Sequence, residues 1–74
     1  MKIDITNCSW EKLLILAKKC GFFTPEGGRH TRVEDKNGNL ITTIPRKNHL
    51  NKHTVKGIVE DFKRCGCIIP ITNN

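Results

Sequence analysis

An Asn-Gly pair at residues 37–38 is the feature that most restricts the fold of this 74-residue chain. The pair readily adopts the positive φ angles of a tight hairpin turn. It lies between segment 29–34, where Val33 sets the inward phase, and segment 40–44, which is rich in β-branched residues. Pro45 ends the second segment, because proline has no N–H to donate to a strand ladder. The centre of the chain is therefore predicted to form an antiparallel hairpin.

Helical periodicity occurs on both sides of this hairpin. Apolar residues recur three and four positions apart in segment 10–20 and again in segment 55–65. Ser9 and Asn51 are suitable N-caps for the two helices. Segment 22–25 has the character of a further short strand. Together these patterns predict an α+β fold with the order α-β-β-β-α, in which two helices cover one face of a three-stranded antiparallel sheet.

The predicted fold is a single domain over residues 1–74, with a core from about residue 9 to residue 66. The apolar tail at 67–71 has no predicted place in it. The longest aliphatic run, at 13–17, is much shorter than the roughly 20 residues that cross a bilayer. The N-terminus also lacks the pattern of an export signal. We therefore expect a cytoplasmic protein without a membrane partner.

Positive charge is concentrated in the second half of the chain. The sequence has 13 Lys and Arg against 7 Asp and Glu, a formal charge of +6. Segment 36–59 contains five Lys and Arg but no Asp or Glu. Such a concentration on a small domain is typical of a partner that carries phosphate. A solvated basic face that only keeps the protein soluble is the alternative.

His30 is the candidate for chemistry. It follows Gly27 and Gly28 and is predicted to share the face opposite Val33 with Arg32, whereas Arg29 should have the inward phase of Val33. A histidine beside a cation suits proton transfer at a phosphate group, because it titrates near neutral pH. An ordinary surface histidine is the alternative.

No metal or other cofactor is expected. His49 and His53 are four residues apart, but Asn51 is predicted to start a helix between them, which breaks the spacing of a metal-binding pair. The cysteines lack the usual zinc-site spacing, and a cytosolic chain is expected to keep them as thiols. Two of them fall on the apolar helix stripes, where packing explains them. The four are Cys8, Cys20, Cys65 and Cys67, and the two on the stripes are Cys20 and Cys65.

The order and spacing of four short motifs resemble HicA, the small toxin of HicAB toxin–antitoxin modules, also described as YcfA-like proteins. The motifs are Cys-Gly-Phe at 20–22, Gly-Arg-His at 28–30, Thr-Ile-Pro at 43–45 and the helix-opening segment 50–58. The resemblance covers most of the chain. Two positions depart from it: Arg29 stands where the family has Ser or Asn, and His53 stands where the family has glycine.

The resemblance implies a fold like that of the double-stranded-RNA-binding domain. It also implies an mRNA interferase, an endoribonuclease that blocks translation and is neutralised by a HicB-type antitoxin. The motif histidine is His30, which would act as general acid or base, while the 2′-hydroxyl of mRNA is the nucleophile. Gly27 and Gly28 would position the site. The residues expected to bind RNA are Arg29, Arg32, Arg46, Lys47 and Lys52.

Two other functions remain open from the sequence. The first is a module that binds duplex RNA by its shape and phosphates without cutting it. The second is a protein-interaction module whose basic face meets an acidic partner.

Overall fold

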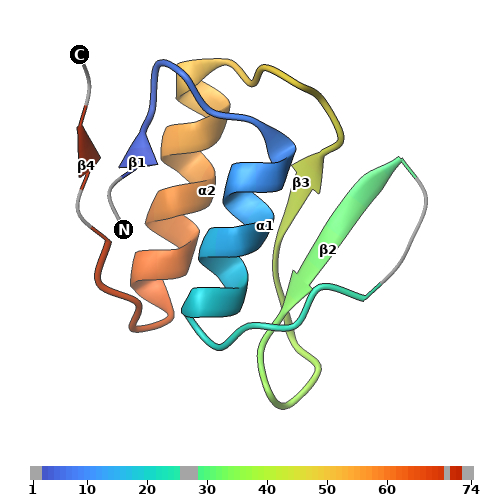
Figure 1. The fold of residues 1–74 in the computed structure, drawn as a ribbon. Coiled ribbons are helices and arrows are strands. Elements are labelled where there is room, and N and C mark those ends of the chain that lie inside the picture. Colours follow the sequence, from blue (N-terminus) through green and yellow to red (C-terminus); the bar gives the residue numbers. More distant parts are fainter. Residues whose placement is uncertain (1–2, 26–28, 70, 73–74) are drawn as a thin grey trace.

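The protein is a small α+β fold, described here by a computed structural model over residues 3–25, 29–69 and 71–72. Figure 1 shows the two helices side by side, with a β-hairpin next to them. The helices pack against the second strand of that hairpin. The elements in chain order are β1 (Ile3–Asp4), α1 (Trp10–Lys19), β2 (His30–Glu34), β3 (Leu40–Pro45), α2 (Lys52–Arg64) and β4 (Ile71–Thr72).

Both helices begin at the predicted caps. The Ser9 hydroxyl accepts a hydrogen bond from the Lys12 backbone N–H at 3.4 Å. The Asn51 side chain accepts one from the His53 N–H at 2.8 Å. These side chains satisfy backbone donors that a helix leaves without internal partners. The predicted bounds of the two helices are therefore confirmed to within a residue or two.

The core combines the apolar stripes of the helices with the inward residues of the hairpin. Phe62 of α2 is fully buried and its ring lies 5.3 Å from that of Phe22. Val33 and Ile44 are the fully buried residues of β2 and β3. Burial of these side chains provides most of the favourable free energy of a domain this size. It also fixes which face of the hairpin is turned toward the helices.

The hairpin turn forms where the Asn-Gly pair predicts it. Gly38 has a φ of 83°, which is accessible to glycine without strain. The Asp35 carboxylate accepts hydrogen bonds from the backbone N–H groups of Asn39, at 2.9 Å, and Asn37, at 2.8 Å. These bonds, the one from Asn39 first, lower the pKa of Asp35 below its usual value, because they favour the charged form. The local sequence is therefore sufficient to explain this turn.

Among the described residues, the predicted three-stranded sheet is found only in part: β2 and β3 pair, and the third strand is represented by a single bridge between Phe23 and Glu34. Phe23 exchanges two backbone hydrogen bonds with Glu34, at 2.9 and 2.8 Å. In an antiparallel ladder the next such pair would require an N–H at Pro25, which proline lacks. The strand expected over 22–25 therefore does not extend beyond Phe23.

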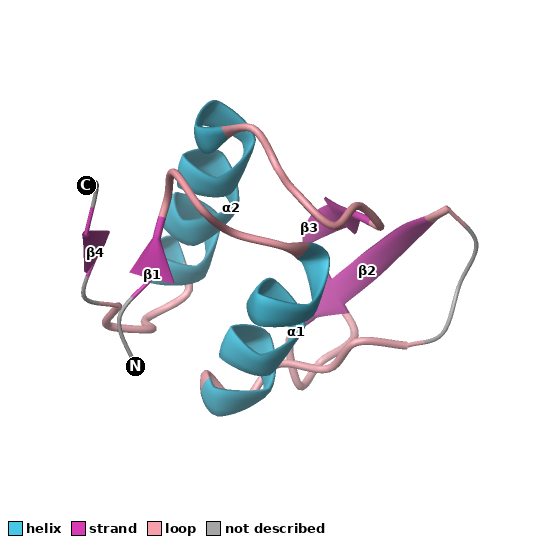
Figure 2. Ribbon diagram, turned by 45° about the horizontal axis from the view of Figure 1, so that its top comes forward, coloured by secondary structure: helices cyan, strands magenta, loops and turns pink. Residues whose placement is uncertain are grey.

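The apolar tail, for which the sequence predicted no position in the fold, packs against the N-terminal segment. Ile69 is buried, and β4 pairs in parallel with β1, Ile71 facing Ile3. Figure 2 shows this pair beside α2, on the side away from the hairpin. Such a pairing joins the two ends of the chain, so local sequence patterns carry no sign of it.

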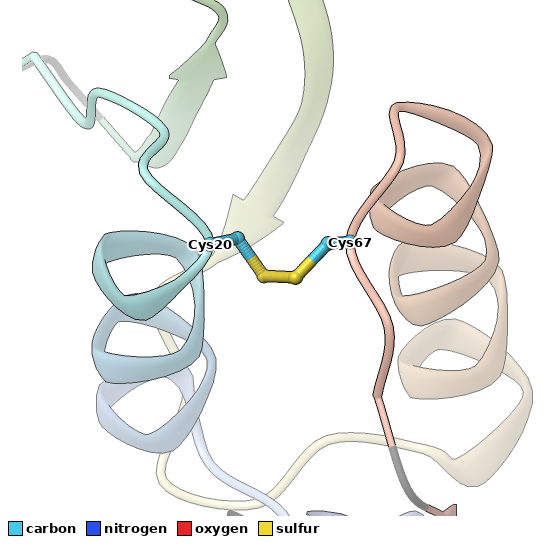
Figure 3. Close-up of a disulfide and its surroundings, with 2 residues drawn as sticks. All are labelled: Cys20 and Cys67. Atoms are coloured by element: carbon cyan, nitrogen blue, oxygen red, sulfur yellow. A yellow bond between two sulfur atoms is a disulfide. The ribbon is translucent and has the colours of Figure 1, made fainter.

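The expectation that all four cysteines remain thiols is wrong for two of them. Cys20 and Cys67, which are 47 positions apart, form a disulfide that links the end of α1 to the segment after α2 (Figure 3). Cys8 and Cys65 are free. Cys65 is exposed at the end of α2. The prediction that it packs in the core, which came from its position on the apolar stripe, is therefore wrong.

The disulfide also bears on where the protein works. Structural disulfides persist in oxidising compartments and are rare in the cytosol, so the expected cytoplasmic location does not explain this one.

Among the described residues, no helix is both long enough and apolar enough to cross a membrane.

Candidate nucleic-acid interface

The alternation of β2 turns His30 away from the core. Thr31 and Val33 are 3% and 0% exposed, whereas His30 and Arg32 are exposed. This confirms the predicted faces of the strand. Arg29, expected to have the inward phase of Val33, is instead exposed just before the strand begins. His30 is therefore open to a ligand that approaches the outer face of the hairpin.

Arg32 shares this outer face but carries a partner. Its Nε lies 3.0 Å from the Glu34 Oε2, two residues further along the strand. The arginine side chain is 51% exposed, so water weakens the ion pair. Arg32 therefore offers less net positive charge to a phosphate than the sequence suggests.

Arg46 lies on the other side of the hairpin. Its guanidinium carbon is 5.2 Å from the centre of the Trp10 ring, and its Nε lies 3.4 Å from the Thr31 Oγ1. Thr31 is buried on the helix side of β2, whereas its neighbour His30 is on the outer side. The structure thus does not bring Arg46 onto the face of His30.

The connection from β3 to α2 is tied to the start of α1. The Lys47 carbonyl accepts a hydrogen bond from the Trp10 N–H at 3.0 Å, and the Leu50 N–H donates to the Cys8 carbonyl at 2.9 Å. Figure 1 shows this connection running from the end of β3 to the start of α2, away from β2. The exposed His49 lies in it, so the loop does not carry this histidine back over the outer face of the hairpin.

Several of the predicted contacts nevertheless gather at one end of the molecule. Figure 1 shows that β2 begins, β3 ends and both helices begin at this end. Glu11 is an acidic residue in the first turn of α1 there. Exposed basic residues also lie at this end, just before β2, just after β3 and at the first position of α2. They are Arg29, Arg46, Lys47 and Lys52. We call these four residues and His30 the basic end.

Two other expectations concern loops and metals. Gly27 and Gly28, which were predicted to position the site, lie outside the described residues. Within the residues that are described, no three or more His, Cys, Asp or Glu side chains are grouped so that they could hold a metal ion.

A cluster around Thr31 was missed by the sequence analysis. The Thr31 Oγ1 accepts hydrogen bonds from the Trp10 Nε1, at 2.7 Å, and from the Arg46 Nε. Trp10 had been assigned only to an apolar helix stripe. The available signal was a polar residue at an inward position of a strand, since a buried hydroxyl requires a hydrogen-bond partner.

Replacing Thr31 with valine is expected to lower the free energy of unfolding by about 1–2 kcal/mol, because the Trp10 N–H loses its partner. Valine keeps the shape and the β-propensity of threonine. Urea unfolding of the variant provides the measurement, with Thr43→Val as the control. Thr43 is an exposed β3 residue opposite Arg32, and its replacement should change stability by less than about 0.5 kcal/mol. Equal effects of the two substitutions would contradict the role given to Thr31.

Comparison with known proteins identified no matching protein-family model, no matching curated protein and no matching solved structure.

Proposed function

We propose that this chain is a metal-independent endoribonuclease that acts on mRNA as a toxin of the HicA kind and is neutralised by a HicB-type antitoxin. The observation that carries the proposal is the position of His30, which is exposed at the start of β2 within the basic end. In this proposal the fold is a variant of the double-stranded-RNA-binding domain, and the Phe23–Glu34 bridge marks where its third strand joins the hairpin.

The chemistry requires little from the protein. The 2′-hydroxyl of RNA attacks the adjacent phosphorus atom, a proton leaves that hydroxyl, and the departing 5′-oxygen receives a proton. His30 performs one of these transfers, while Arg29, Lys47 and Lys52 bind phosphates and stabilise the developing charge. Correct placement of one proton-transfer group accelerates a reaction by roughly 10²–10⁴-fold, so we expect a slow enzyme.

A second candidate function is RNA binding without cleavage. It is favoured by the path of the loop that carries His49, which leads away from the outer face of the hairpin. His30 therefore lacks, among the described contacts, the partner that a second proton transfer would use. A purely binding protein would rely on the same basic residues, through phosphate and 2′-hydroxyl contacts.

Controlled expression in growing cells whose cytosol allows disulfides to form distinguishes the two functions, because an ordinary reducing cytosol would leave the Cys20–Cys67 bond open. We expect the wild-type chain to arrest growth and fragment mRNA, and His30→Ala to do neither. The matched control is His53→Ala, which removes an exposed histidine from the first turn of α2 and should remain toxic. Circular dichroism must show that all three proteins fold. Arrest by His30→Ala equal to that by the wild type would remove the catalytic assignment and leave RNA binding as the better explanation.

A further inference from the structure

Three of the four cysteines gather at the end of the molecule where both helices terminate. Cys20 and Cys65 are the C-cap residues of α1 and α2. Cys67 follows Cys65 by two positions, and Figure 3 shows its disulfide reaching across to Cys20. The remaining cysteine, Cys8, is buried just before α1. The exposed free thiol of Cys65 is therefore two positions from one half of the disulfide.

Cys65 also shares a hollow with the other half of the disulfide. The hollow has a volume of about 410 Å³, and both Cys20 and Cys65 line it. Cys65 is exposed and Cys20 is half-buried, so solvent reaches this part of the surface. The two residues come from the ends of different helices, and the lining brings a free thiol and a disulfide sulfur to one place. The described lining also includes Gly21, Phe22, Asp35, Lys36 and Asn37.

A thiol beside a disulfide has a defined chemistry. A thiolate attacks one sulfur of the bond, and the other sulfur leaves as a thiolate. Here the Cys65 Sγ forms a bond to the Cys20 Sγ, the Cys20–Cys67 bond breaks, and its electron pair leaves on the Cys67 Sγ. The proton that Cys65 gives up returns to Cys67. One disulfide and one thiol are present before and after this step, so it needs no oxidant or reductant.

The residue between the two cysteines of this step gives the chain room to move. Gly66 has a φ of 96°, and a Cβ built there would meet none of the described atoms within 4 Å. The turn therefore lies in open space and is not held by side-chain packing. Small rotations in it shift Cys65 relative to Cys67, as the attack on the bond requires.

The tail decides which pairing is favoured. Bonds from Cys20 to Cys65 or to Cys67 close loops that differ by only two residues, so their effects on the entropy of the unfolded chain are nearly equal. The Cys20–Cys67 bond additionally anchors the segment that leads to the buried Ile69 and to β4. We therefore expect the Cys20–Cys67 form to be the major one.

We propose that Cys65 is the nucleophile of an internal thiol–disulfide exchange, which converts the Cys20–Cys67 bond into a Cys20–Cys65 bond. The exchange releases Cys67 as a thiol and leaves the tail attached to the domain by noncovalent contacts alone. The hollow is the site of this reaction, and the disulfide of the same chain is its substrate. The inference is independent of the proposed ribonuclease activity.

The test starts from the purified oxidised chain, without reductant or oxygen, transferred from acid to about pH 8, where more of each exposed thiol is thiolate. Samples taken over time are acidified, alkylated and digested, and mass spectrometry identifies the bonded cysteines. Cys65→Ser removes the nucleophile, and Cys8→Ala is the matched control that removes the other free thiol. We expect alkylation of Cys67 to increase with time in the wild type and in Cys8→Ala, and this increase to be lost in Cys65→Ser.

The time course separates this exchange from other reactions. A Cys20–Cys65 peptide that forms at a rate independent of protein concentration would support exchange within one molecule. A rate that rises with protein concentration would overturn it. Disulfides that contain Cys8 and form equally fast would also overturn it, because a buried thiol takes part only when the chain unfolds. A wild-type Cys67 that stays bonded, or that is released equally in Cys65→Ser, would remove Cys65 as the nucleophile.

The variant Cys67→Ser tests the product of the exchange. We expect oxidised glutathione to form its Cys20–Cys65 bond, and circular dichroism to show that the variant folds. Hydrogen exchange at Ile71 should be faster than in the wild type, because the tail has lost its covalent anchor. Failure to form this bond, under conditions in which Cys65→Ser forms Cys20–Cys67, would overturn the proposal. Equal hydrogen exchange in the two proteins would overturn the effect on the tail.

Discussion

Loss of the Cys20–Cys67 disulfide should lower the free energy of unfolding by about 4 kcal/mol. The bond closes a loop between cysteines 47 positions apart, so it removes much conformational freedom from the unfolded chain. The core of a domain this small rarely supplies more than about 3–5 kcal/mol, so the loss would be comparable to the rest of its stability. Chemical denaturation of the oxidised chain, the reduced chain and the double variant Cys20→Ala/Cys67→Ala measures the effect.

Cys65→Ser is the control, because it changes an exposed free cysteine and should alter stability by less than about 0.5 kcal/mol. Alkylation counts the thiols. The folded oxidised chain should react at Cys65, while Cys8 is protected because it is buried and burial raises the pKa of its thiol. Unfolding without reductant should then expose Cys8. Alkylation of all four cysteines at that stage, or equal stability of the oxidised and reduced chains, would show that the bond is absent or unimportant.

His30→Ala should lower the rate of RNA cleavage by roughly 10²–10⁴-fold, the range that one general acid or base contributes. RNA affinity should change much less, because binding depends on cations at other positions of the basic end. Single-turnover assays with saturating protein separate the rate of cleavage from affinity. This prediction concerns the chemical step, which the growth assay does not isolate.

Two further variants sharpen this measurement. His30→Gln keeps the size and a hydrogen-bonding group but cannot titrate, so it should be as slow as His30→Ala. His49→Ala removes the exposed histidine of the β3–α2 connection and should leave the rate unchanged. A large loss with His49→Ala would mean that the loop moves over the hairpin in the complex with RNA.

Local sequence signals account for the helices and the hairpin. Ser9 and Asn51 set the helix starts because their side chains satisfy backbone N–H groups within three residues. Residues 37–38 set the turn, and the alternation around Val33 separates the exposed His30 from the buried Thr31. These features depend on neighbours in the sequence, so they can be predicted without the structure.

The remaining features depend on residues that are distant in the sequence. The pairing of β1 with β4 joins segments near the two ends of the chain, and the Cys20–Cys67 bond links residues 47 positions apart. The side of the hairpin on which Arg46 lies is set by Trp10, which α1 brings next to Thr31. Arg46 was predicted to bind RNA without any prediction of its face, and packing places it on the face of the hairpin opposite His30. The shortened strand at 22–25 is different, because its cause is visible in the sequence. Pro25 has no N–H for the strand ladder, so the end of this strand at Phe23 could have been predicted.

The most direct test of His30-dependent RNA cleavage uses purified wild-type and His30→Ala protein in the presence of a chelator. Each protein is incubated with an RNA and with the same sequence as DNA, and the ends of the products are identified by mass spectrometry. The account predicts that the wild type cleaves the RNA alone and leaves 2′,3′-cyclic phosphate ends, whereas His30→Ala leaves it intact. Cleavage of the DNA, or equal cleavage of RNA by both proteins, would contradict it.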